Sequence, residues 1–391
     1  MSTATSTPNE STLVNILDAA SGGAWISFEE GLEIYRHSST QDLVAAATKR
    51  TTQLWGGKGS DRTYLMYYLL NYSNVCAENC TFCNYWAPAN HENAWTYNFE
   101  DVKDSLQQYY DYGGRVILFQ GGNNYAINDF SYYTTFLSKI REHFPEFYVF
   151  GTSPTEIYFW SSHHKMSVGQ ILSELRAAGL KGIAGAGGEI GHQAIRDLMF
   201  KRKVPFETWL DIMDEACSYG LTSSASMMFG TFDGLDERFE AEMCRLEHME
   251  KLRQRQGKTS QYMAFVAWPY QPNQARIRDK AVPHDDYIRT MCMARLFMRN
   301  FPNLQSSYLS LNKQQFQDSL DYAINCSGGI LYTPELVTGA VDANPNDLSR
   351  KQIIEWINDG GHVAQERDYY GRKLNDPYTG RSHLSNLAVD K

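Results

Sequence analysis

From residue 61 onward, short apolar segments of strand length alternate with stretches of helical periodicity. The expected strands are 63–74, 115–120, 147–153, 182–187, 222–230, 262–268, 306–311 and 320–325. The expected helices between them are 99–112, 131–143, 167–178, 191–199 with 206–219, 235–256 and 285–300. Parallel strands need long crossover connections, and helices usually supply them. The pattern therefore predicts an α/β fold, a closed (βα)8 TIM-type barrel. A doubly wound open sheet is the alternative.

Helical patterns flank this barrel on both sides. Residues 1–60 are expected to form a polar tail followed by helices, and the barrel is expected over 61–330. Residues 331–391 are expected to form a C-terminal helical cap. Its helix should occupy 349–361, with Ser349 as the N-cap.

Composition limits the classes of function that the chain can serve. Hydrophobic residues make up 42% and charged residues 21% of the 391 residues, as in globular proteins. The net charge of −9 argues against nucleic acid or an anionic membrane as the main partner. No apolar run approaches the roughly 20 residues of a membrane span, and the N-terminus lacks the pattern of a secretory signal. Seven cysteines, an odd number, fit a reducing cytoplasm better than a disulfide framework. We therefore expect a cytoplasmic protein.

Three of these cysteines, Cys76, Cys80 and Cys83, follow the first expected strand with the spacing C-x3-C-x2-C. Three thiolates can hold three irons of a cubane and leave the fourth iron open to an external amine and carboxylate. A zinc site with His91 as the fourth ligand is the alternative reading of the triplet. A non-catalytic protein that uses the cysteines structurally is the alternative from another functional class.

The triplet, with Phe82 before its last cysteine, resembles the radical S-adenosylmethionine (SAM) superfamily. The resemblance implies a [4Fe–4S] cluster on Cys76, Cys80 and Cys83, with SAM on the open iron and Phe82 beside its adenine. It also implies reductive cleavage of SAM to methionine and a 5′-deoxyadenosyl radical, which then attacks a small-molecule substrate. A flavodoxin- or ferredoxin-type protein would supply the electron.

Further candidates for binding SAM follow the second, third and fourth strands. Gln120, Gly121 and Gly122 match one form of the superfamily motif that receives the SAM amine, and glycines let backbone groups approach a ligand closely. The resemblance places Ser153 near the carboxylate or ribose of SAM. Glu189 emerges at a glycine-rich strand end, suited to ribose hydroxyls, although a carboxylate there can also serve a helix N-terminus.

Two residues are the candidates for acting on the substrate. Glu156 follows the third strand, where it could serve catalysis or cap the next segment. Cys326 is expected directly after the eighth strand, on the face of the barrel that carries the chemistry. Cysteines elsewhere in the barrel region, at 217, 244 and 292, are most simply small buried hydrophobes.

Six segments in order resemble the menaquinone and deazaflavin branch of the superfamily: NYSNVC, LFQGG, SPTEI, GGEI, MMFG and WPYQP. Its members are the dehypoxanthine futalosine cyclase, the aminofutalosine synthase and the deazaflavin synthase. The C-terminal pattern G-x-x-x-x-Q-R-D-x-x-Y of the cyclase is also present, with one residue inserted, from Gly361 to Tyr370. The resemblance implies hydrogen abstraction followed by ring closure or carbon–carbon bond formation on a small polar substrate.

Two departures from the branch fall on the substrate side. The branch pattern H-A-F-S-P reads Phe150-Gly-Thr-Ser-Pro here, and its G-A-N-D reads Ala323-Ile-Asn-Cys326. Motifs for SAM are kept while substrate-side positions differ, which is expected of a relative with a different substrate. A related step in specialised-metabolite biosynthesis is therefore the alternative to the cyclase reaction.

Overall fold

The computed structural model describes residues 10–200, 202–272, 277, 280–332, 349–370 and 372–374. The polar tail expected at the N-terminus lies outside these residues, apart from its last position. Among the residues described, no helix is long and apolar enough to cross a lipid bilayer.

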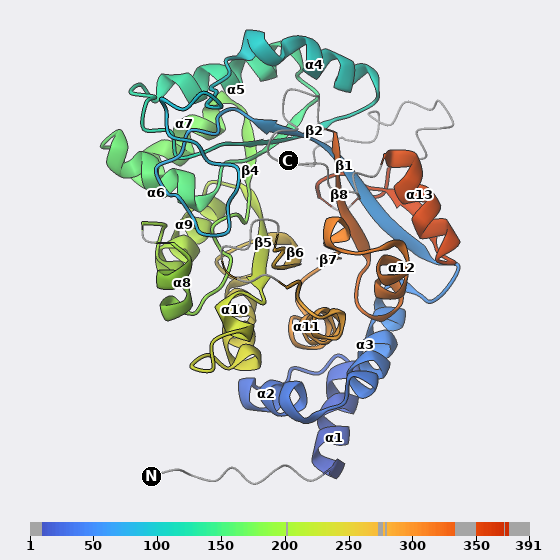
Figure 1. Ribbon diagram of the computed structural model, residues 1–391. Coiled ribbons are helices and arrows are strands. Elements are labelled where there is room, and N and C mark those ends of the chain that lie inside the picture. Colours follow the sequence, from blue (N-terminus) through green and yellow to red (C-terminus); the bar gives the residue numbers. More distant parts are fainter. Residues whose placement is uncertain are drawn as a thin grey trace.

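Eight parallel strands close into a barrel (Figure 1). They are β1 (Asp61–Asn71), β2 (Val116–Gln120), β3 (Tyr148–Gly151), β4 (Leu180–Ile183), β5 (Thr222–Phe229), β6 (Tyr262–Pro269), β7 (Leu304–Gln305) and β8 (Cys326–Tyr332). Neighbours in sequence pair throughout, and β1 pairs with both β2 and β8. The sheet therefore has no break, which confirms the (βα)8 barrel and excludes the open doubly wound sheet.

Helices cover the outside of the barrel (Figure 1). They are α4 (Phe99–Asp111), α5 (Ser131–His143), α6 (Pro154–His163), α7 (Val168–Ala178), α8 (Gln193–Met199), α9 (Phe206–Ser218), α10 (Ala241–Arg255), α11 (His284–Phe297) and α12 (Lys313–Tyr322). Each has buried apolar side chains; in α9, for example, Trp209, Met213 and Ala216 recur at helical spacing and are buried. Helix α6 was not expected, although Ser153 as N-cap and Pro154 at the first helical position are signals for one.

Three further helices precede the barrel, as predicted: α1 (Glu10–Ser21), α2 (Phe28–His37) and α3 (Thr40–Trp55). In Figure 1 they form the blue layer below α10 and α11. Helix α3 packs along α11, and α2 packs against α10. The N-terminal helices thus cover the outer helical ring and stay away from the strand ends.

The last two strands differ from the expectation. Residues 306–311 form a turn with a short 3-10 helix, Tyr308–Ser310, and the strand before it is only β7. The segment 320–325, expected as the eighth strand, begins with the end of α12, because Phe316 and Leu320 lie four residues apart on its buried face. Strand β8 starts later, at Cys326, in a serine- and glycine-containing stretch with weak strand propensity.

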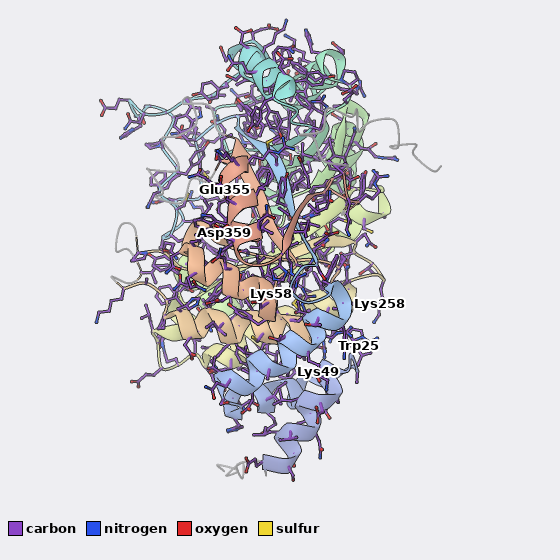
Figure 2. The ribbon with its side chains drawn as sticks, turned by 90° about the vertical axis from the view of Figure 1, so that its right-hand side faces the viewer. Trp25, Lys49, Lys58, Lys258, Glu355 and Asp359 are labelled. Carbon is purple, nitrogen blue, oxygen red and sulfur yellow. The ribbon has the colours of Figure 1, made fainter. Side chains whose placement is uncertain are left out.

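The C-terminal part adds helix α13 (Arg350–Asp359), capped by Ser349 as predicted, and an unexpected strand, β9 (Val363–Glu366). Strand β9 pairs in parallel with residues 61–64 of β1. Thr63 pairs with Cys326 of β8 and with Gln365 of β9, so β9 lies on the edge of β1 that β2 uses further along. Figure 2 shows α13, with Glu355 and Asp359 labelled, leading toward Lys58. Lys58 pairs with Asp321 at 2.6 Å.

After β9, the chain enters the N-terminal end of the barrel. Tyr369 stacks on Tyr148 with ring centroids 4.7 Å apart and packs against Phe150 at 4.4 Å. Leu65, Val116, Phe150 and Tyr369 form a buried cluster, which we call the barrel floor. A side chain from the C-terminal part therefore closes the end of the barrel opposite the predicted active face.

A buried ion pair holds β9 in place. The guanidinium of Arg350 on α13 binds the carboxylate of Glu366 on β9, and both side chains are 8% exposed. Tyr64 of β1 donates its hydroxyl to the same carboxylate at 3.4 Å. Burial raises the pKa of Tyr64 to about 12, so it stays protonated and can donate. The three side chains tie α13, β9 and β1 together.

We predict that Glu366→Ala lowers the free energy of unfolding by about 3–5 kcal/mol, because Arg350 becomes a buried charge without its partner. Urea unfolding measures the change. The double variant Arg350→Met with Glu366→Leu replaces the pair by apolar side chains and should recover most of the loss. A Glu366→Ala protein within about 1 kcal/mol of the wild type would contradict this role.

Candidate active site

The cysteine loop leaves the C-terminal end of β1, directly after Asn71. Cys76, Cys80 and Cys83 are thiols outside any disulfide, with Cys80 buried and the other two half-buried. The Cys76 sulfur accepts hydrogen bonds from the backbone nitrogens of Glu78 and Asn123, each at 3.4 Å. Such N–H···S bonds are among the contacts by which proteins stabilise and tune iron–sulfur clusters.

The thiols are close enough to influence one another. The pKa of Cys80 is raised to about 12, mainly by burial; the ammonium of Lys203 opposes the shift, and Cys83 and Cys76 contribute to it. Burial also raises the pKa of Cys76. Thiolates are the form that binds metal, so metal binding at this loop must displace protons from sheltered thiols.

The loop after β2 packs directly against the cysteine loop. A Cβ atom on Gly122 would lie 2.3 Å from the carbonyl oxygen of Val75 and 2.9 Å from the Cβ of Cys76, so this position requires glycine. The Gly122 nitrogen donates to the carbonyl of Ser73 at 2.8 Å. Gln120 donates its side-chain amide to Asn71 at 3.0 Å. The ends of β1 and β2 are thus fixed to each other at the point where both loops begin.

Glu156 connects these loops to α6. It is 3% exposed, and its carboxylate accepts hydrogen bonds from the Tyr72 hydroxyl at 2.8 Å and the Gly121 nitrogen at 3.2 Å. It also accepts from the nitrogen and hydroxyl of Ser153, completing a capping box at the start of α6. Burial raises the pKa of Glu156 to about 7, although these hydrogen bonds oppose the shift. The structure thus shows Glu156 in the capping role. Its hydrogen bond with the Gly121 nitrogen holds the glycine loop against the start of α6.

Glu189 forms a buried pair with Lys203, a residue that the sequence reasoning missed. The Lys203 ammonium lies 2.6 Å from one carboxylate oxygen, and both side chains are about one-tenth exposed. The other oxygen is buried without a hydrogen-bond partner. Although burial acts to raise the pKa of Glu189, Lys203 and Arg196 hold it below its usual value. The Lys203 ammonium also lies 5.2 Å from the centre of the Phe82 ring. Phe82, Glu189 and Lys203 therefore form one wall beside the cysteine loop.

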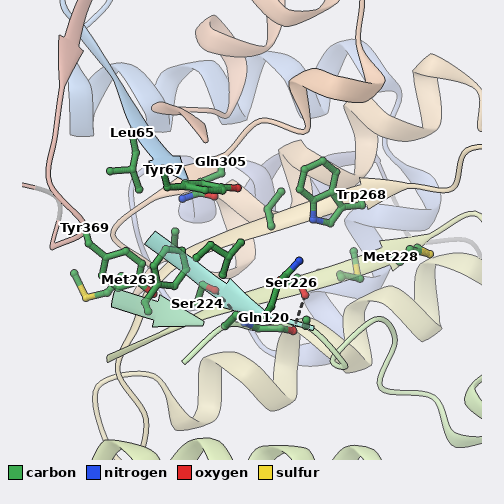
Figure 3. Close-up of a pocket in the computed structure, with 18 of the residues that line it drawn as sticks. Leu65, Tyr67, Gln120, Ser224, Ser226, Met228, Met263, Trp268, Gln305 and Tyr369 are labelled. Atoms are coloured by element: carbon green, nitrogen blue, oxygen red, sulfur yellow. Dashed lines mark hydrogen bonds between the residues drawn. The ribbon is translucent and has the colours of Figure 1, made fainter. Parts of the chain in front are cut away.

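A cavity of about 280 Å³ extends from this face into the barrel. Figure 3 shows Trp268 and Met228 at one end and Leu65 and Tyr369 at the other. Gln120 and Glu189 line it near the strand ends; further lining residues are Tyr67, Leu118, Phe150, Gly185, Ser224, Ser226, Met263, Val266, Gln305 and Arg367. Most of these side chains are apolar or aromatic, as is usual for cavities that hold small organic molecules.

Neither side chain expected to act on the substrate lines the cavity. Glu156 lies behind the glycine loop. Cys326 was expected after the eighth strand but is its first residue, fully buried at the opposite end of the barrel from the cysteine loop. The expectation was wrong because the eighth strand was expected at 320–325, whereas β8 begins at Cys326. Cys326 still neighbours the cavity through Arg367, whose Nε donates to its sulfur at 3.3 Å.

The arrangement does not support a zinc site at the triplet. Ligands of one zinc ion converge within about 2.0–2.3 Å of it, and among the described residues no three His, Cys, Asp or Glu side chains are placed to hold one ion. His91 is exposed, and its Nδ1 accepts from the Asn93 nitrogen at 3.2 Å. A cubane instead takes each cysteine on a different iron, so the sulfurs need not converge.

Comparisons with known proteins agree with this geometry. A model of the radical SAM superfamily matches residues 70–243, and a model of the CofH/MqnC C-terminal region matches residues 259–377. The chain is 30% identical over 388 residues to the cyclic dehypoxanthine futalosine synthase of Streptomyces coelicolor, covering 96% of this chain and 94% of that protein.

Two more distant matches extend the comparison. The aminodeoxyfutalosine synthase of Thermus thermophilus is 27% identical over 368 residues, covering 93% of this chain and 96% of that protein. A crystal structure of HydG, a maturase of the [FeFe]-hydrogenase, matches with a TM-score of 0.71 at 13% identity, over 92% of this chain and 77% of that chain. The HydG match supports the fold alone.

The raised pKa of Glu156 predicts a pH-dependent stability. The folded carboxyl holds its proton up to about pH 7, whereas the unfolded one releases it near 4.5. Its contribution to stability is therefore fully present below about pH 4.5 and is lost as the pH rises through 7. Glutamine does not titrate, so Glu156→Gln should gain about 3 kcal/mol on the wild type between those limits. Urea unfolding across this pH range measures it. Parallel curves for the two proteins would show that the folded carboxyl ionises normally.

Proposed function

Since the chain belongs to the radical SAM superfamily, with the C-terminal region found in CofH and MqnC, we propose that Cys76, Cys80 and Cys83 hold a [4Fe–4S] cluster with an open iron for SAM. The donor set fits such a cluster. It consists of three thiols on one loop, with backbone N–H groups directed at Cys76 and a lysine close to Cys80. When bound, this cluster supplies the electron that cleaves SAM to methionine and a 5′-deoxyadenosyl radical.

The residues around the cysteine loop suit the parts of SAM. Gly121 and Gly122, beside Gln120, present backbone where the SAM amine would lie next to Cys76. Glu189 has one buried oxygen without a partner, which supports its role toward the ribose hydroxyls. Phe82, beside Lys203, offers a face to adenine. The Ser153 hydroxyl takes part in the cap of α6. We propose that Ser153 lies near the SAM carboxylate or ribose, because Glu156 links it to Gly121.

We further propose that the substrate is a small polar molecule held in the barrel cavity, where hydrogen abstraction leads to ring closure or carbon–carbon bond formation. The observation that carries this function is the continuity between the Gly121–Gly122 loop, which touches the cysteine loop, and the cavity that begins at Gln120. Mostly apolar walls keep water away from a radical. The reaction of cyclic dehypoxanthine futalosine synthase is the model for this proposal.

A related reaction on a different substrate, in specialised-metabolite biosynthesis, is the second candidate. Phe150 lines the cavity at the position of the histidine in the branch pattern, and Cys326 replaces the aspartate of G-A-N-D. Both changes lie at the floor end of the cavity, away from the cysteine loop. In either case, we expect a flavodoxin- or ferredoxin-type electron donor and a cytoplasmic setting.

We predict that Cys80→Ala abolishes 5′-deoxyadenosine formation from SAM in anaerobic, iron-reconstituted protein reduced with dithionite, because one iron loses its thiolate. Chromatography of the nucleoside measures it. Cys244→Ala is the matched control: Cys244 is also buried but lies on α10 in the helical ring, and its removal should leave the product unchanged.

The wild-type preparation should be brown, with four irons per chain. A colourless zinc protein, or 5′-deoxyadenosine formation by Cys80→Ala at the wild-type rate, would contradict the cluster assignment and favour a structural metal site.

We predict that Glu189→Gln weakens SAM binding roughly tenfold, because an amide replaces the charged acceptor proposed for the ribose hydroxyls. Equilibrium dialysis of SAM against the reconstituted protein measures the dissociation constant. Glu207→Gln on α9 is the control, since that glutamate is exposed on the outer surface. Equal affinity in wild type and Glu189→Gln would remove Glu189 from the SAM site.

A further inference from the structure

Lys203 is a cation held inside the protein beside the cysteine loop. Its ammonium lies 5.2 Å from the centre of the Phe82 ring and 5.1 Å from that of Phe200, and its side chain is about one-tenth exposed. Aromatic faces attract a cation, more strongly where water is excluded. The backbone agrees with this placement, because the nitrogen and hydroxyl of Thr81 both donate to the carbonyl of Met199, at 3.0 and 2.8 Å. The segment that carries Lys203 is therefore joined to the cysteine loop between its second and third cysteines.

A second buried cation, Arg196, holds Lys203 against Glu189. The Arg196 side chain is 1% exposed, and its guanidinium donates to the carbonyls of Gly187 at 3.0 Å and Val204 at 2.6 Å. Gly187 belongs to the loop that carries Glu189, and Val204 directly follows Lys203. One side chain thus binds both of the backbone segments whose ammonium and carboxylate meet at 2.6 Å.

The two charges of this pair act unequally on Cys80. Burial dominates the raised pKa of the Cys80 thiol; after burial, the Lys203 ammonium lowers this pKa, and the Glu189 carboxylate raises it by a smaller amount. Although burial acts to lower the pKa of Lys203, Glu189 and Cys80 hold it above its ordinary value, so the amine stays protonated. At the sulfur of Cys80, the cation therefore outweighs the anion with which it is paired.

A positive charge beside a cysteine ligand favours the reduced form of an iron–sulfur cluster. Reduction adds one negative charge to the cluster, and the reduction potential depends on nearby charge and on burial. Charges interact more strongly where the surroundings are of low polarity, as they are around a lysine that is about one-tenth exposed. A carboxylate in the same place has the opposite effect. Glu189, which we assign to the SAM ribose, would by itself repel the added electron.

We propose that Lys203 tunes the cluster: its ammonium offsets the Glu189 carboxylate and makes one-electron reduction of the cluster more favourable. The electron comes from an external donor, a flavodoxin- or ferredoxin-type protein or dithionite. The cluster is reduced, the donor is oxidised, and no bond forms or breaks in this step. The inference rests on the proposed function, because it requires a cluster on the three cysteines.

The midpoint potential tests this role without any turnover. Anaerobic redox titration of the reconstituted full chain, without SAM and followed by electron paramagnetic resonance, measures it. Lys203→Met should lower the equilibrium constant for reduction at least about tenfold, which is a shift of about 59 mV for one electron. Lys203→Arg keeps the charge and should retain most of the wild-type potential. A wild-type potential in Lys203→Met would overturn the proposal.

A matched control removes a lysine from another ion pair. Lys251 on α10 pairs with Glu207 at 2.5 Å, and both side chains are more than one-third exposed. Lys251→Met lowers the net charge of the protein by the same amount as Lys203→Met. It should leave the midpoint potential unchanged, because water screens an exposed charge. An equal shift in both variants would refute a local effect of Lys203.

Removal of the opposite charge should shift the potential in the opposite direction. Glu189→Gln leaves Lys203 without its counter-charge and should raise the midpoint potential. The double variant Lys203→Met with Glu189→Gln carries neither charge and should lie between the two single variants. If Lys203 served packing alone, both single variants would shift in the same direction or not at all, which would refute the inference. The comparison of the wild type with Glu189→Gln remains decisive if Lys203→Met does not fold.

Failure of the proposed function is visible separately in the same spectra. A wild-type protein that shows no cluster signal after reduction would refute the cluster, and the inference with it. Failure of the inference alone appears as wild-type potentials in variants that retain the cluster. A lysine that served only the carboxylate of SAM would give this result, since it would change the affinity for SAM and leave the potential without SAM unchanged.

Discussion

The pairing of β1 with β2 at their C-terminal ends is the constraint on which the site depends. Asn71 pairs with Gln120 in the strand register, and their side chains are joined by a hydrogen bond. The two loops that follow must therefore run side by side, and Gly122 permits the contact with Cys76. The cysteine loop is fixed on its other flank by Thr81, which binds the carbonyl of Met199 at 2.8 Å. Contacts on both sides thus fix the loop that carries the three thiols proposed to hold the cluster.

Charged side chains are buried at several positions in and around the barrel, and not all of them are paired with an opposite charge. Glu189 and Lys203 neutralise each other beside the cysteine loop. Arg350 and Glu366 do the same on the outside of β1. Arg367 has no such partner among the described residues. In a medium of low polarity, an unpaired charge acts strongly on whatever enters the cavity. The cavity thus has a neutralised pair, Glu189 with Lys203, toward the cysteine loop and the cation of Arg367 at the floor.

The sequence was sufficient for the barrel, the cysteine loop and the glycine loop. Strands and helices alternate so many times that the barrel could be predicted even though some boundaries were wrong. The C-x3-C-x2-C spacing lies within eight residues, so its chemistry could be inferred without knowledge of the fold. The eighth strand was misplaced because 320–322 continue the periodicity of α12, while β8 begins in serine and glycine. Helix α6 was not predicted, although Ser153 as N-cap and Pro154 at the first helical position are typical of a helix start.

Other parts of the site could not be predicted, because they depend on contacts between distant segments. Lys203 lies among basic residues between α8 and α9 and has the pattern of a solvent-exposed turn; only the fold brings it to Glu189. Strand β9 has only four residues, and it pairs with a segment of β1 that lies some 300 positions earlier in the sequence. The pattern containing Arg367 was visible in the sequence, but its burial in the cavity was not. Long-range packing decided all three.

The position of Tyr369 in the barrel floor has a consequence for the order in which the protein is made. A ribosome synthesises all eight barrel strands before it reaches this residue, so a barrel formed without Tyr369 would lack the ring that covers Tyr148 and Phe150 at its lower end. A transcript that ended shortly before this codon would still encode every cysteine and every residue assigned to SAM. Its product would keep every residue proposed to hold the cluster and SAM, but its barrel would be open at the base to solvent and oxygen.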